Sequence, residues 1–147
     1  MKIRSQLYAA LADDSYLGRE VRNGHHLDDH RLVLGVARLT VHRHVDNRLT
    51  GYQGTVYRHD ETGEFVVAHR GTESPMDVLS DLTMLGARFN AQAADAIALT
   101  NDALKLAQAS RDQYGGAPPV TVTGHSLGGT LAQITAHHFN LKGETFN

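Results

Sequence analysis

The sequence predicts an α/β protein in which a mixed β-sheet is flanked by helices. Residues 31–72 hold runs rich in β-branched side chains, and the polar segment at 59–64 divides the second run as a hairpin turn would. A long helical repeat at 91–114, a short apolar strand at 120–123 and a helix at 127–139 then follow. Strands that precede a helix–strand–helix series indicate both antiparallel and parallel pairing within one sheet.

Three further segments complete the expected elements. Residues 3–12 carry apolar side chains at helical spacing and predict a short amphipathic helix. Ser74 as N-cap and Pro75 at the first helical position predict a second helix, which Gly86 should end. The last residues, KGETFN at 142–147, are typical of the start of another core strand. We therefore expect one domain over residues 1–147, with its sheet truncated after the helix at 127–139.

The composition excludes several classes of protein. The chain has 147 residues, of which 41% are hydrophobic and 20% charged, as in ordinary soluble domains. Fourteen Lys and Arg against sixteen Asp and Glu give a net charge of −2, which gives no support for a nucleic-acid partner. There is no cysteine, so disulfides, thiolate catalysis and cysteine-based zinc sites are excluded. Asp13 and Asp14 interrupt an N-terminus that lacks a sustained apolar core, so we expect no Sec signal peptide. The protein should be soluble, and either cytoplasmic or exported by a signal-independent route.

The segment Gly124-His125-Ser126-Leu127-Gly128 fits the G-x-S-x-G pattern of a nucleophile elbow. In such a turn, glycines on both sides of the serine let a strand and a helix approach closely and lift the hydroxyl clear of the sheet. The N–H of Leu127, at the helix start, would then be one donor to an oxyanion. The alternative is a serine in an ordinary glycine-rich turn. The apolar strand before the motif and the amphipathic helix after it favour Ser126 as a catalytic nucleophile.

A second segment, Arg70-Gly71-Thr72, ends an apolar strand. The backbone N–H and the hydroxyl of Thr72 could both donate to an oxyanion there. Alternatively, Thr72 or Ser74 only caps the following helix.

Together the segments VVAHRGTESPMDVLSDL and VTVTGHSLGGTLAQITA resemble the class 3, or fungal-type, lipase family. The resemblance implies an α/β-hydrolase fold, with Ser126 as nucleophile, Thr72 and Leu127 in the oxyanion hole, and no cofactor. It also implies hydrolysis of carboxylic esters of lipids, with transient contact to a membrane or lipid interface. A phospholipase or thioesterase of the same fold remains an alternative.

The sequence departs from the family pattern in two places. His69 replaces a bulky apolar residue before Arg70. The family's catalytic acid and histidine follow the serine, and both would lie beyond Asn147. The chain alone could therefore be an inactive fragment or a binding module, and the open strand edges of a truncated sheet would favour self-association.

The ten histidines offer other candidates for a base or a metal ligand. His69 is near the expected oxyanion loop and is a candidate base. His137 and His138 lie about 15 Å or more from Ser126 along the helix, and His125 is expected to be structural. His42 and His44 alternate on a strand and should face the same way, but an exposed polar face explains them better than a metal site. We expect no metal, and we interpret Asp77, Asp81 and Asp95 as capping and surface residues.

Overall fold

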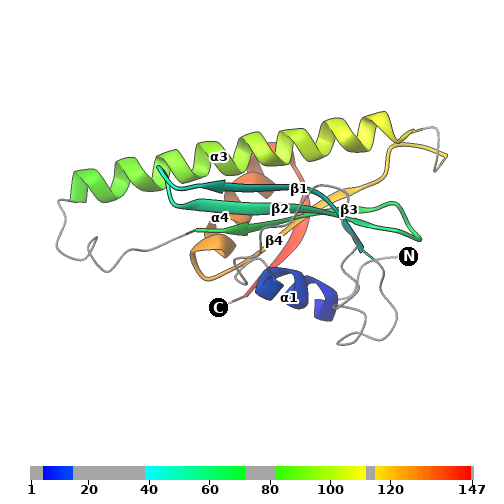
Figure 1. The fold of residues 1–147 in the computed structure, drawn as a ribbon, viewed down its shortest axis with the longest axis horizontal. Coiled ribbons are helices and arrows are strands. Elements are labelled where there is room, and N and C mark those ends of the chain that lie inside the picture. The colour runs from blue at the N-terminus through cyan, green and yellow to red at the C-terminus, as the bar shows by residue number, and fades with distance from the viewer. Residues whose placement is uncertain (1–4, 15–38, 72–81, 112–114, 147) are drawn as a thin grey trace.

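The computed structural model describes residues 5–14, 39–71, 82–111 and 115–146. Its centre is a five-stranded sheet in which the strands follow one another in the order β1-β2-β3-β4-β5 (Figure 1). The strands are β1 (Leu39–Asn47), β2 (Tyr52–His59), β3 (Phe65–Arg70), β4 (Val120–His125) and β5 (Lys142–Phe146). The first three pair antiparallel, whereas β3, β4 and β5 are parallel, so the predicted mixed sheet is confirmed.

Helices cover both faces of this sheet, as Figure 1 shows. On one face, α3 (Leu82–Ala109) and α4 (Leu127–Phe139) pack over a core that includes Phe65, Leu99 and Leu131. On the other face, α1 (Ser5–Asp14) packs with Leu7 and Leu11 on a smaller cluster. The apolar alternation along β2 and β3 thus serves two cores, because successive side chains point to opposite faces.

The long helix α3 differs from the prediction. We expected Gly86 to end one helix and a second to begin near residue 91, but α3 runs without interruption from Leu82 to Ala109. Gly86 is exposed, and a Cβ at this position would meet no atom within 4 Å. An isolated glycine costs a helix only about 1 kcal/mol relative to alanine, which packing of the rest of the helix outweighs. Residues 75–81 lie outside the described part of the chain.

The ends of the chain agree with the prediction in outline. Helix α1, described over Ser5–Asp14, overlaps the expected 3–12, and α4 occupies the expected 127–139. Segment 142–146 is a strand parallel to β4, as expected, but its residues are exposed or half-buried because β5 is an outer strand of the described sheet. Among the described residues, no helix has the length and apolar character needed to cross a membrane.

Candidate active site

Ser126 is the single residue between the end of β4 at His125 and the start of α4 at Leu127. Its backbone has φ 56° and ψ −121°, a conformation that is costly for a residue with a side chain. The residue is exposed. It lies at the carboxyl ends of the parallel strands β3, β4 and β5, where open α/β sheets bind their ligands. The local geometry is that of a sharp strand-to-helix turn that presents a hydroxyl to solvent.

Two glycines make this sharp turn sterically feasible. A Cβ at Gly124 would collide with the carbonyl oxygen of Gly128, and a Cβ at Gly128 would collide with the carbonyl oxygen of His69. The strand β4, the first turn of α4 and the neighbouring strand β3 therefore meet backbone to backbone. These contacts give a tertiary reason for the glycine at each end of the motif.

Backbone hydrogen bonds hold the turn in place. The N–H of Ser126 donates to the carbonyl oxygen of Phe146 at 2.8 Å. The carbonyl oxygen of Ser126 accepts from the N–H groups of Gly129 at 2.9 Å and Thr130 at 3.2 Å. The turn is thus fixed on one side by the end of β5 and on the other by the first turn of α4.

The end of β3 lies beside this turn. A Cβ at Gly71 would be 2.6 Å from the side chain of Leu127 and 2.8 Å from Oε1 of Gln92 on α3. Gly71 directly precedes Thr72, the predicted oxyanion residue, which lies outside the described residues. The fold therefore brings the segment that leads to Thr72 next to Leu127, although the two positions are 55 residues apart in the chain (127 − 72 = 55).

His69 does not serve as a base for Ser126 in this arrangement. Its ring is fully buried, with Nδ1 2.7 Å from the hydroxyl of Tyr52 and Nε2 3.0 Å from the hydroxyl of Thr135 and 3.3 Å from that of Thr100. Burial lowers the pKa of His69 to about 3, so the ring is neutral. Both ring nitrogens are engaged inside the core between β2, α3 and α4, which makes His69 a structural residue.

The prediction that His42 and His44 face the same way is wrong. A bulge between Val41 and Arg43 leaves His42 as an extra residue, and its ring packs edge-on against Phe65 in the core under α3. His44 instead lies 2.8 Å through Nδ1 from the hydroxyl of Thr55, on the opposite face of the sheet. Within the described residues, no group of three or more His, Asp or Glu side chains could hold a metal ion.

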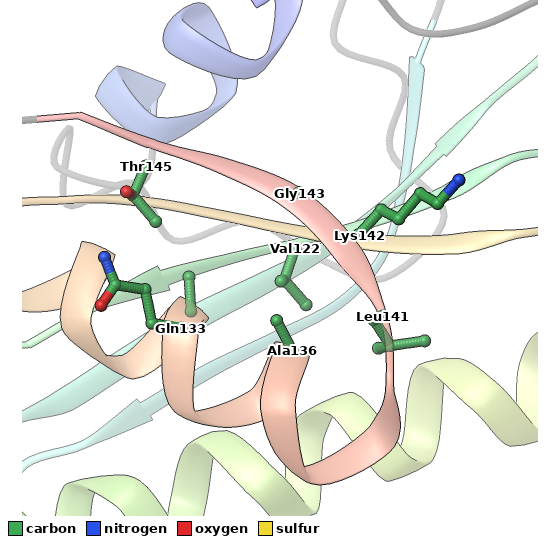
Figure 2. A pocket seen from close by; sticks show the side chains of 8 residues that line it. Val122, Gln133, Ala136, Leu141, Lys142, Gly143 and Thr145 are labelled. Carbon is green, nitrogen blue, oxygen red and sulfur yellow. The ribbon is translucent and has the colours of Figure 1, made fainter.

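A groove between α4 and β5 is separate from Ser126. It has a volume of about 450 Å³ and lies between α4 and β5, where Val122, Ala136 and Leu141 form its apolar part and Gln133 and Lys142 its polar part (Figure 2). Ser126 and Leu127 do not line it.

A family model for the Tle-like phospholipase domain, described as phospholipase-like, matches residues 7–147. The chain belongs to this family. A comparison with curated protein sequences finds no match.

Solved lipase structures share the fold of this Tle-like phospholipase domain. The lipase from Rhizopus microsporus var. chinensis has a TM-score of 0.63 at 20% identity, over 95% of this chain and 55% of the lipase. Lip2 lipase from Yarrowia lipolytica has a TM-score of 0.64 at 16% identity, over 95% and 56%. Lipase II from Rhizopus niveus has a TM-score of 0.62 at 22% identity, over 91% and 53%. The α/β-hydrolase fold and the resemblance to fungal-type lipases are thereby confirmed, and the chain spans about half the length of these lipases.

The sequence of this phospholipase-like domain did not disclose every residue that shapes the turn. Phe146 contributes only its carbonyl oxygen, and no residue-type pattern marks such a contact. Gln92 lies in an alanine-rich helical segment, and only the structure shows that its amide is buried. The tertiary fold was needed to place both beside Ser126 and Gly71.

Proposed function

We propose that this chain is the part of a serine hydrolase that carries the nucleophile, and that the enzyme cleaves carboxylic esters of phospholipids. The single observation that supports this most is Ser126, exposed and strained between β4 and α4. The family model, which is phospholipase-like, favours the phospholipase alternative over a triacylglycerol lipase.

In the proposed reaction, Oγ of Ser126 attacks the ester carbonyl carbon while a histidine accepts the hydroxyl proton. The carbonyl oxygen becomes a tetrahedral oxyanion, which accepts hydrogen bonds from the N–H groups of Leu127 and Thr72. Each such donor is typically worth about 3 kcal/mol of barrier. Collapse of the intermediate expels the alcohol, which takes the proton from the histidine, and water then hydrolyses the acyl-enzyme at Ser126.

We further propose that the histidine and its orienting carboxylate come from outside residues 1–147. His69 is occupied in the core and is therefore not this base. The order nucleophile, acid, histidine is that of α/β-hydrolases. The rival proposal is a non-catalytic module that binds a partner.

The test compares this chain with a longer form of the protein that continues past Asn147. The longer form is expected to hydrolyse phosphatidylcholine and to react with a fluorophosphonate, whereas the 147-residue chain should do neither at a comparable rate. Ser126→Ala in the longer form should abolish both, while Ser110→Ala, which alters a hydroxyl bonded to the carbonyl of Leu106, should abolish neither. Undiminished turnover by Ser126→Ala would exclude Ser126 as nucleophile, and no turnover by either form would favour the binding module.

A further inference from the structure

The turn between β1 and β2 presents an isolated apolar side chain to solvent. Leu49 is 96% exposed, and among the described residues it is the one large hydrophobic side chain that is exposed. It is next to Arg48, which is also exposed. A single exposed leucine is not in itself unusual, so its setting decides whether it has a use.

The setting is a turn that is tied firmly to α3. The N–H of Gly51 donates to the carbonyl oxygen of Asn47 at 2.8 Å, and the N–H of Leu49 donates to the side-chain oxygen of Asn47 at 3.1 Å. Oδ2 of Asp95 on α3 accepts from the hydroxyl of Thr50 at 2.6 Å and from the amide of Asn47 at 3.0 Å. These bonds fix the backbone that carries Leu49. When the Leu49 side chain inserts into a partner surface, few additional groups therefore lose conformational freedom.

A third hydrogen bond also joins α3 to the turn. Nε of Arg88 donates to the carbonyl oxygen of Thr50 at 3.2 Å. Arg48, which is exposed in the turn, and Arg88, which is bonded to it, bring two arginines to this end of the sheet. A guanidinium binds a phosphate group through paired hydrogen bonds.

The turn lies at the same end of the strands as Ser126. The register pairs Asn47 with Tyr52, Gln53 with Arg70, and His69 with Gly124, so the turn is level with the carboxyl ends of β3 and β4. Figure 1 shows the β1–β2 turn at the same end of the sheet as the end of β3 and the start of α3. A flat surface that touches Leu49 would therefore face this end of the strands.

We propose that the β1–β2 turn docks the protein on a phospholipid surface, with Leu49 inserted among acyl chains and Arg48 against lipid phosphate. This proposal rests on the proposed function for its partner, since the substrate is then part of the same surface. Full burial of one leucine changes partitioning about tenfold to a hundredfold, so the contact is weak and reversible. Such a contact lets an enzyme bind, turn over lipid and leave.

The test exploits the absence of tryptophan from the chain. Leu49→Trp introduces the single tryptophan of the chain at the turn, where its emission can be excited selectively. Glu61→Trp is the matched control, at an exposed position of the β2–β3 turn at the opposite end of the strands. With phosphatidylcholine vesicles, the emission of Leu49→Trp should shift to shorter wavelength and be quenched by brominated acyl chains, whereas that of Glu61→Trp should not change. Equal shifts for both variants, or no shift for Leu49→Trp, would overturn the proposal. A shift of Leu49→Trp that grows with protein concentration in the absence of vesicles would indicate self-association and would also overturn it.

Vesicle flotation supplies an independent measurement. Leu49→Asp should lower the bound fraction at least about tenfold, because it replaces the inserted side chain by a charge. Arg48→Glu should also lower binding, whereas Arg111→Glu, an exposed arginine just beyond the far end of α3, should not. Unchanged binding by Leu49→Asp would contradict the proposal. Neither assay depends on turnover, so docking can fail while Ser126 is a nucleophile, or succeed while it is not.

Discussion

The carbonyl oxygen of His69 occupies the space that a Cβ at Gly128 would need, so that β3 and the first turn of α4 touch without an intervening side chain. The same turn of α4 lies against Gly124 of β4. Ser126 is therefore held at the junction of three backbone segments, and small changes in volume at this junction should be felt at the serine.

Gly128→Ala should lower the free energy of unfolding by about 1–3 kcal/mol, because the added methyl group must displace backbone atoms of β3. The matched control is Gly86→Ala in α3, where a Cβ meets no atom within 4 Å. That change should raise the free energy of unfolding by about 0.5–1 kcal/mol. Urea unfolding measures both, and equal effects of the same sign would refute the packing account.

Gly71→Ala should affect catalysis more than the bulk of the fold. The new Cβ would press on Leu127 and Gln92 and displace the strand end that leads to Thr72. A displacement of about 1 Å at a reacting group can cost about 10²-fold in rate. In the longer form of the protein, the rate of fluorophosphonate labelling should fall by this order, while Gly86→Ala should label normally. A normal rate for Gly71→Ala would mean that this contact does not position the oxyanion donors.

The stability of the fold should decrease in mild acid because of His69. Its pKa is about 3 in the folded protein, against an ordinary value of 6.5. Below pH 6.5 the unfolded chain binds a proton that the folded chain does not, so stability is full above pH 6.5 and is lost as the pH falls toward 3. In this range the free energy of unfolding should fall by up to about 1.4 kcal/mol per pH unit.

Two variants isolate this contribution. His69→Asn should be less stable at neutral pH, since it loses the contacts with Tyr52 and Thr135, but should show a shallower dependence on pH. Tyr52→Phe removes the hydroxyl that contacts His69 and should lower the free energy of unfolding by about 1–3 kcal/mol. Because the histidine stays buried, this variant should retain the pH slope. Urea midpoints across the acidic range provide the measurement. A pH slope in His69→Asn as steep as in the unaltered protein would assign the acid sensitivity to other groups.

Asp95 and Asp102, two carboxylates on α3, should differ in how much they stabilise the fold. Asp95→Ala removes the acceptor of Thr50 and Asn47 and should cost about 1–3 kcal/mol, with faster amide exchange at Leu49 and Gly51. Asp102→Ala breaks an ion pair with Arg43 at 3.1 Å whose side chains are 31% and 50% exposed, and should cost at most about 1 kcal/mol. Hydrogen exchange with denaturant titration separates the two. If Asp95→Ala leaves exchange at the turn unchanged, the tether to α3 does not hold it.

Much of the fold could be read from local patterns. Alternating β-branched residues predicted the strands up to Arg70, and the G-x-S-x-G motif between a strand and a helix predicted the turn at Ser126. Such features depend on neighbours along the chain, which the sequence lists directly. The second helix boundary was misjudged at Gly86, because a helix end depends on packing of the whole helix as well as on one weak helix former.

The sequence by itself determined the mixed sheet, the parallel strand before Ser126 and the residue that is proposed to attack the ester. Only the tertiary structure decided that His69 is a buried structural residue, that His42 and His44 lie on opposite faces, and that Phe146 holds the amide of Ser126. The reason is physical: burial, a strand bulge and contacts between backbones are set by segments distant in the chain, and no local residue pattern encodes them.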